Sequence, residues 1–325
     1  MSQRVAVIGA GVAATSVIHW LKILRPLDKI VQFSSENLAP AASLRSTAVA
    51  ALRGTQRGIS ALGDELCEHW EFSDQFYAES RLPGVVAGEL ETWINDEKEM
   101  RRFSHLPEAR ESFLGPKQRP VKIVREKCWL IDPEVFLSSF DESHEHYRAL
   151  VTELRPFAKG WLVKTQTGES EFEKVILCTG AWQRWMKRVV PSSELDTIKP
   201  SQGSYFEWSQ QHTSDHSFAL SFHGLNLHYR HDIKTLQLGA TTIKNSDLLS
   251  PSLTHLEAIK KLFLSQVELE LDFSKARIHT GIRSILQTRR PFAGQLDQGL
   301  CAMNGLYKNG WISAWPLAKK LCSTL

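Results

Sequence analysis

The chain has 325 residues, of which 42% are hydrophobic and 23% charged, and these shares are typical of a globular protein with a large core. Its formal net charge of +3 is too small to indicate a nucleic-acid-binding protein, and no run of 18 or more apolar residues indicates a membrane span. The length predicts two domains that share one core.

The five cysteines are odd in number and scattered, and no pair has the C-x-x-C spacing of a thiolate zinc site. They indicate neither a disulfide framework nor a metal centre, and a reducing cytoplasm fits them best. The sequence also lacks the H-E-x-x-H metal motif and the G-x-S-x-G turn of many hydrolases. Metalloprotease and serine-hydrolase chemistry are therefore not indicated.

Residues 5–14 read as a short apolar strand that passes through a glycine turn into an apolar helix. Gly9 allows the tight turn, and Gly11 removes a side chain where a pyrophosphate approaches the backbone. The helix from Val12 and Ala13 directs free N–H groups and its positive dipole end at the phosphates, and Ala14 is small enough for close packing on the strand. This pattern predicts a dinucleotide cradle.

Two alternatives to the cradle remain open at this point. A glycine-rich turn between strand and helix can occur without any ligand. A secretory signal is the other, although the single Arg4 makes a thin basic region and Lys22 and Arg25 follow the apolar stretch closely.

The second strand of the cradle is predicted over residues 29–33, and Ser34, Ser35 and Glu36 follow it. An acidic residue at the end of this strand normally binds the adenosine ribose. Here Ser34 takes the expected acidic place and Glu36 comes two residues later, so all three are candidates for the ribose contact.

Residues 41–54 combine small and hydroxyl side chains with two cations, Arg45 and Arg53. Such a stretch, close after the cradle, suits a second pyrophosphate contact, and an ordinary helix start is the alternative. The candidate contacts are Ser43, Arg45, Ser46 and Thr47.

Further along, Asp132 is expected to cap a helix whose first position is Pro133. Two strand-like runs flank a turn after it, at residues 160–165 and 174–178. The second run ends in Thr179, Gly180, Ala181 and Trp182, a turn that would bring bare backbone next to the dinucleotide.

Taken in order, these segments resemble the D-amino-acid-oxidase-like flavoproteins. This family includes glycine oxidase, sarcosine oxidase and the FAD domain of the bifunctional tRNA wobble-uridine modification enzyme. The resemblance covers nearly the whole chain, and it rests on the cradle and on residues 42–47, 131–133, 175–182, 281–284, 305–311 and 314–316.

The resemblance implies an α/β fold with a Rossmann-like FAD-binding domain of the glutathione-reductase type and a second, antiparallel-sheet α+β substrate domain. Residues 1–83, 132–197 and 278–325 would form the FAD-binding domain, and residues 84–131 and 198–277 the substrate domain. The FAD would be non-covalent, because no cysteine or histidine stands where the resemblance places flavin attachment. Besides the candidates above, it would contact Gly281, Gly305, Tyr307, Lys308, Asn309, Gly310 and Trp311.

For the substrate, the resemblance implies three residues with catalytic roles. Arg283 would clamp a carboxylate through its planar guanidinium, with a structural salt bridge as the alternative. Tyr229 would be the pocket tyrosine, although Arg230 replaces the family's following proline. Lys308 would stabilise the negative charge of reduced flavin, or else point into solvent.

The favoured activity is FAD-dependent oxidation of the C–N bond of an amino acid or secondary amine by hydride transfer to flavin N5. The product is an imine that water hydrolyses, and oxygen or another acceptor takes the electrons. One alternative is the oxidative removal of a carboxymethyl group from a modified tRNA wobble uridine, since residues 236–241 are similar to that tRNA enzyme. The other is a flavin-binding scaffold without turnover.

Overall fold

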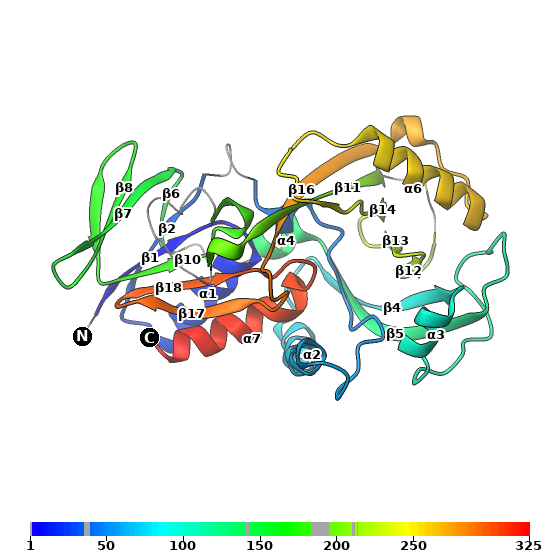
Figure 1. The fold of residues 1–325 in the computed structure, drawn as a ribbon, viewed down its shortest axis with the longest axis horizontal. Helices are drawn as coiled ribbons and strands as arrows, with labels where there is room; N and C mark the ends of the chain where they lie inside the picture. The colour runs from blue at the N-terminus through cyan, green and yellow to red at the C-terminus, as the bar shows by residue number, and fades with distance from the viewer. Residues whose placement is uncertain (1, 36–39, 141–142, 184–194, 210–211, 213) are drawn as a thin grey trace.

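The computed structural model describes residues 2–35, 40–140, 143–183, 195–209, 212 and 214–325. Among them the strands form a six-stranded, a nine-stranded and a three-stranded sheet. The six-stranded sheet and its helices lie at one end of the molecule and the nine-stranded sheet at the other (Figure 1).

The six-stranded sheet has the order β17-β18-β10-β1-β2-β6. The apolar runs at residues 5–8 and 175–177 are buried throughout, as expected for parallel strands covered on both faces. All pairs are parallel except β17 with β18. The strands are β1 (Arg4–Ile8), β2 (Lys29–Phe33), β6 (Glu145–Tyr147), β10 (Lys174–Leu177), β17 (Phe292–Asp297) and β18 (Leu300–Asn304).

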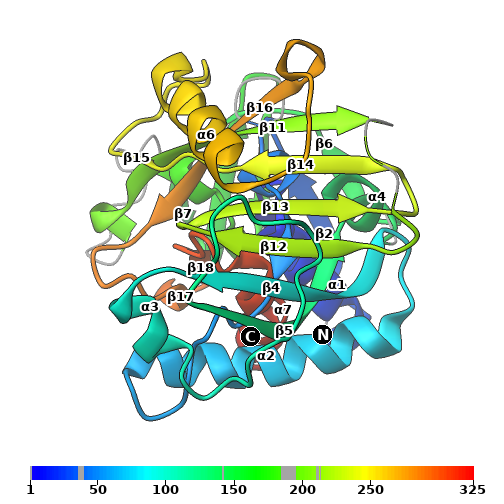
Figure 2. The same cartoon turned by 90° about the vertical axis from the view of Figure 1, so that its right-hand side faces the viewer.

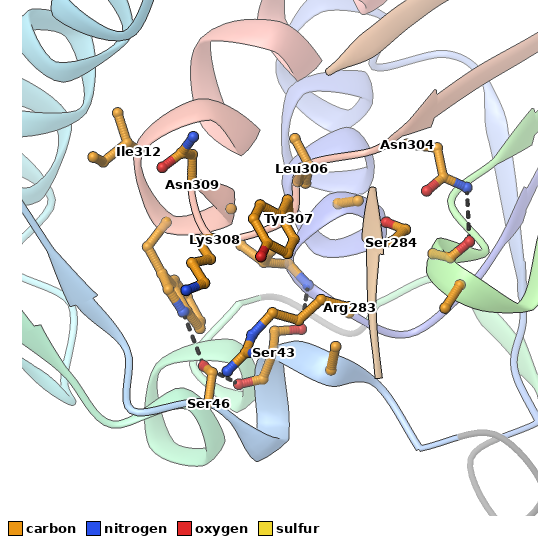
Figure 3. A pocket seen from close by; sticks show the side chains of 18 of the residues that line it. Ser43, Ser46, Arg283, Ser284, Asn304, Leu306, Tyr307, Lys308, Asn309 and Ile312 are labelled. Atoms are coloured by element: carbon orange, nitrogen blue, oxygen red, sulfur yellow. Dashed lines mark hydrogen bonds between the residues drawn. The ribbon is translucent and has the colours of Figure 1, made fainter. Parts of the chain in front are cut away.

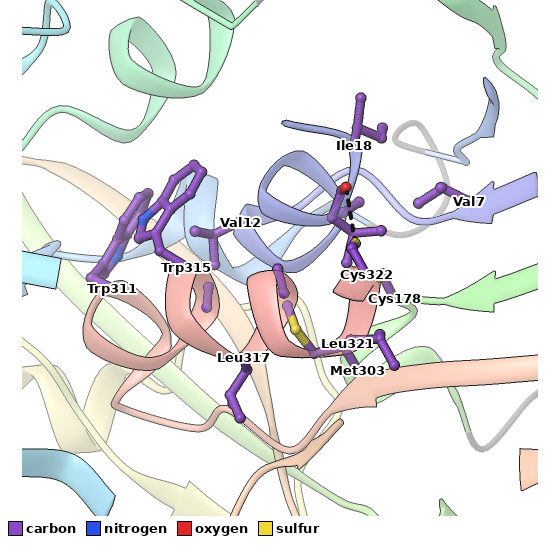
Figure 4. Close-up of a cluster of buried hydrophobic side chains, with 14 of the residues drawn as sticks. Val7, Val12, Ile18, Cys178, Met303, Trp311, Trp315, Leu317, Leu321 and Cys322 are labelled. Atoms are coloured by element: carbon purple, nitrogen blue, oxygen red, sulfur yellow. Dashed lines mark hydrogen bonds between the residues drawn. The ribbon is translucent and has the colours of Figure 1, made fainter. Parts of the chain in front are cut away.

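Helices α1 (Val12–Leu24) and α7 (Gly310–Ser323) pack on one face of this sheet, with α2 (Ala61–Ser80) against α7. Figure 4 shows Trp311, Trp315 and Leu321 of α7 in this core, together with Val7 and Val12. The other face is covered by the three-stranded sheet of β7 (Val151–Phe157), β8 (Gly160–Thr165) and β9 (Glu169–Phe172). The five cysteines are buried free thiols.

The nine-stranded sheet has the order β15-β11-β14-β13-β12-β4-β5-β3, and β16 pairs with β11 (Figure 2). Helix α6 (Leu253–Gln266) covers one face through Leu256, Ile259 and Phe263. The strands are β3 (Val49–Ala50), β4 (Val85–Ile94), β5 (Lys122–Ile131), β11 (Lys199–Ser209), β12 (Phe218–Phe222), β13 (Leu225–Arg230), β14 (Thr235–Gly239), β15 (Ile243–Lys244) and β16 (Arg277–Ile285).

Two short α-helices complete the described α-helices, α3 (Glu97–Arg102) and α4 (Pro133–Ser138). Asp132 caps α4 as predicted, because its carboxylate accepts hydrogen bonds from the backbone N–H groups of Glu134 and Val135, each at 3.0 Å. In the described ranges no helix is long and apolar enough to cross a bilayer.

The predicted fold class is confirmed, with a parallel sheet in one part and a largely antiparallel sheet in the other. Two details differ from expectation. Strands β4 and β12 pair in parallel. The runs at 160–165 and 174–178 do not simply flank a turn, because strand β9 lies between them in the chain.

The domain boundaries stay a prediction. Strand β3, within residues 1–83, and strand β16, almost entirely within residues 278–325, both pair with the nine-stranded sheet. The segments assigned to the FAD-binding domain therefore also supply strands to the other sheet.

Candidate cofactor and substrate site

A cavity of about 1180 Å³ lies between the six-stranded and nine-stranded sheets. Its walls come from the turns after β1, β2 and β10, from the start of α7, and from β16 and the β12–β13 hairpin of the large sheet. Because parallel strands end at one edge of their sheet, these turns meet at the place where α/β folds bind ligands.

The two glycines of the cradle allow close approaches of neighbouring segments. A Cβ on Gly9, whose φ is +142°, would lie 2.3 Å from the carbonyl oxygen of Cys178, so only glycine lets β1 turn this close to β10. A Cβ on Gly11 would lie 2.8 Å from the hydroxyl of Ser43, which accepts a hydrogen bond from the Val12 N–H at 3.0 Å. Ala13 also lines the cavity, while Ala14 is fully buried against the sheet.

The predicted ribose contacts are only partly described. Ser34 and Ser35 line the cavity at the end of β2, and the Ser34 hydroxyl is 2.8 Å from Nε2 of His146. Glu36 lies outside the described residues.

Residues 42–45 form a short 3-10 helix beside the cradle. Ser43, Ser46 and Thr47 line the cavity, and the Ser46 hydroxyl accepts a hydrogen bond from the indole N–H of Trp311 at 3.1 Å. Arg45 does not line it, since its guanidinium is 3.2 Å from Nδ1 of His279 at the exposed side. Three of the four predicted contacts therefore reach the cavity.

Thr179, Gly180, Ala181 and Trp182 all line the cavity, as the predicted contact requires. Gly180 adopts a φ of +56°, and its carbonyl accepts a hydrogen bond from the Asn304 side chain at 3.1 Å (Figure 3). Asn304 ends the buried strand β18 and lines the same wall, although the sequence analysis did not single it out.

The turn before α7 and the first two residues of the helix supply to the cavity wall Tyr307, Lys308, Asn309, Gly310 and Trp311. The first residues of helix α7 line the cavity and its first turn has no acidic side chain, so the positive end of the helix dipole lies at the cavity. This position suits a group that becomes negatively charged.

Gly281 and Gly305 do not line the cavity, and they act through packing. A Cβ on Gly281 would lie 2.9 Å from the Cβ of Arg45, so β16 approaches residues 42–45 closely. A Cβ on Gly305 would lie 2.5 Å from the Leu286 side chain, and its φ of +75° also favours glycine.

Arg283 extends from β16 into the cavity (Figure 3). Its only described hydrogen bond is a long one of 3.4 Å to the carbonyl of Thr241, and no described carboxylate forms an ion pair with it. Burial lowers the pKa of this guanidinium from its ordinary value. A Cβ on Gly203 would lie 2.2 Å from the same guanidinium, so the bare backbone of β11 makes room for it.

Lys308 points into the same part of the cavity as Arg283 (Figure 3). Removal from water, together with repulsion from Arg283 and Arg53, lowers the pKa of its ammonium to about 8. An anion that enters the cavity would stabilise the charged form of this lysine and raise its pKa.

Tyr229 is placed elsewhere. It is 1% exposed and packs against Phe218 in the core on the face of the large sheet that α6 covers, and it is absent from the cavity lining. The residue of β13 that lines the cavity is Asn226. The described geometry thus gives Tyr229 a packing role.

Residues 4–324 match the family model described as FAD dependent oxidoreductase. The chain belongs to this family. No curated protein matches the sequence significantly.

The glycine oxidase of Geobacillus kaustophilus has a similar structure, with a TM-score of 0.79 and 15% identity over 99% of this chain and 95% of that one. The iminodiacetate oxidase of Chelativorans sp. BNC1 has a TM-score of 0.76 and 15% identity, over 98% of this chain and 94% of that one. The FAD-bound L-alpha-glycerophosphate oxidase of Mycoplasma pneumoniae has a TM-score of 0.80 and 14% identity, over 99% of this chain and 94% of that one. At these identities the likeness establishes the fold.

We predict that Gly11→Val abolishes FAD uptake, because a branched side chain would fill the space where the phosphates approach α1 and would collide with Ser43. The measurement is bound flavin per mole of purified protein. Gly168→Val is the control, since a Cβ there meets nothing within 4 Å. Equal loss of flavin in both variants would contradict a specific role for Gly11.

We also predict that Lys308→Met lowers the reduction potential of bound flavin by on the order of 30 mV, which corresponds to about 1.4 kcal/mol in a two-electron couple. Methionine keeps the length of the side chain and removes its charge. Because the lysine loses its proton above a pKa of about 8, the difference between the two proteins should shrink as the pH rises past that value. Identical potentials at pH 7 would mean that the ammonium does not face the flavin.

Proposed function

We propose that the protein oxidises the C–N bond of an amino acid or secondary amine in an FAD-dependent reaction that yields an imine, which water hydrolyses. The observation that carries the proposal is the cavity itself, which joins the cradle to a guanidinium that has no acidic partner among the described residues. The amino-acid and amine oxidases among the structural neighbours support the same class of substrate.

In this proposal the cradle and the turn at residues 179–182 hold the dinucleotide. When bound, the flavin accepts the hydride of the amine carbon. Arg283 pairs with the substrate carboxylate and so fixes the direction in which that carbon faces the ring. The cation of Lys308 and the start of α7 would favour the negative charge of the reduced flavin.

The test begins with the purified protein, which should be yellow and should release FAD, rather than FMN, on acid precipitation. Under anaerobic conditions a panel of amino acids and secondary amines should include members that bleach the flavin absorbance. Protein that takes up no added FAD would overturn the proposal. If FAD binds but no amine reduces it, the protein is better explained as a flavin-binding scaffold without turnover. If only modified tRNA reduces it, the oxidative removal of a carboxymethyl group from the wobble uridine is favoured.

Arg283→Ala should keep FAD and lose affinity for carboxylate substrates, because leaving a buried charge unpaired costs roughly 2 to 5 kcal/mol. Gly203→Ala should have the same effect by displacing the guanidinium, since its new Cβ would occupy the position of the Arg283 side chain. The measurement is the substrate concentration that gives half-maximal flavin reduction. Unchanged values in both variants would exclude Arg283 from substrate binding.

A further inference from the structure

Arg53 is a second guanidinium in the cavity wall, held there by an uncommon backbone. It follows β3 and adopts a φ of 54°, in the left-handed region that non-glycine residues rarely occupy. Gly54 follows it with a φ of +68°, and a Cβ there would lie 2.6 Å from the ring of Phe103. Backbone of this kind persists where packing enforces it, and it clusters at ligand sites.

The guanidinium of Arg53 has unused hydrogen-bonding capacity. Among the described residues one of its five N–H donors is hydrogen-bonded, to the side-chain oxygen of Asn226 at 2.6 Å. No described carboxylate lies within 4.0 Å of it. The carboxyl group of Glu126, whose pKa burial raises, attracts Arg53 without forming an ion pair with it, and one of its oxygens has no hydrogen-bond partner among the described residues.

The charges along the described cavity wall are strongly unequal. One carboxylate, that of Glu99, stands against five cations, Arg53, Arg102, Arg283, Arg289 and Lys308. Arg53 and Arg283 both act on Lys308, whose ammonium they repel. The proposed function gives Arg283 the substrate carboxylate and gives Lys308 the flavin, so Arg53 has no ligand in it.

We propose that Arg53 and Asn226 form a second anion site, and that the substrate is an amino or imino acid carrying a second acidic group. This inference rests on the proposed function and narrows its substrate class. Arg283 pairs with the carboxylate next to the reacting carbon, and Arg53 pairs with the other acidic group. Both arginines are suited to bidentate pairing with a carboxylate.

The test compares substrates that differ only in the second acid. Each enantiomer of glutamate and of aspartate is paired with its amide, glutamine or asparagine, and N-(carboxymethyl)glycine with its monoamide. Anaerobic flavin reduction is measured for each pair. The wild-type protein should require at least about 30-fold less of the acid than of the amide, because breaking a desolvated charge pair costs that much or more.

In Arg53→Gln this preference for the acid should disappear, while the amides and FAD content stay as in the wild-type protein. Arg81→Gln is the matched control, since Arg81 also has a left-handed φ, of 48°, yet is exposed and outside the cavity wall. A readout without turnover is the perturbation of the flavin spectrum by glutarate, which should bind the wild-type protein more tightly than its monoamide and lose that advantage in Arg53→Gln.

The outcomes separate this inference from the proposed function. Reduction by amines with no difference between acid and amide overturns the second anion site and leaves amine oxidation standing. A lower flavin content or a changed reduction potential in Arg53→Gln, with substrate preference intact, overturns it as well and assigns Arg53 to the cofactor. If no amine reduces the flavin, the proposed function itself is overturned. In that case the glutarate measurement still tests the anion site, and equal glutarate binding by the wild-type protein and Arg53→Gln overturns it.

Discussion

The close approach of β1 to β10 at Gly9 is the constraint on which the rest of the site depends. The turn after β1 touches the carbonyl of Cys178, and this contact places the start of α1 at the edge of the sheet where the turn after β10 also ends. The free N–H groups of α1 and the bare backbone at Gly180 therefore border one cavity. A larger residue at Gly9 would separate the two turns, and the cavity would lose the wall that suits a dinucleotide.

A second close approach joins the cradle to the large sheet. Gly203 of β11 and Gly281 of β16 are direct partners across the two strands. The space above Gly281 is taken by the backbone and Cβ of Arg45, and the space above Gly203 by the guanidinium of Arg283. The same pair of glycines thus lets the loop that holds Ser43 reach the large sheet and makes room for the guanidinium of Arg283 in the cavity wall.

Most residues predicted for the cofactor side line one cavity, because glycine turns between strands and helices depend on local backbone geometry, and their contact with FAD stays a prediction. Strand β2 and the cap of α4 have their predicted positions for the same reason. The substrate side depends on which face of a strand looks inward, and a shift of one residue reverses that choice. In β13 the loose alternation left both faces open, and the structure places Asn226 in the cavity wall and Tyr229 in the core.

Contacts between distant segments could not be predicted from local pattern. Gly203 carries no sequence signal for its contact with Arg283, and Asn304 is one polar residue at the end of an apolar strand. Arg45 and Arg53 stood together as cations near the cradle, yet the first binds His279 on the outer side and the second reaches Asn226 across the cavity. The two arginines therefore have different surroundings, although only seven residues lie between them in the sequence.

The excess of cations in the cavity wall links cofactor binding to folding. Below a pH of about 8 the ammonium of Lys308 and the guanidinium groups of Arg53 and Arg283 are all charged, and their repulsion opposes the ligand-free fold. A pyrophosphate at α1 and acidic groups beside the arginines, as proposed above, would replace this repulsion with attraction. Ligands that bind only the folded state stabilise it, and more so the tighter they bind, so anions in a cavity of this charge would add to the stability of the fold.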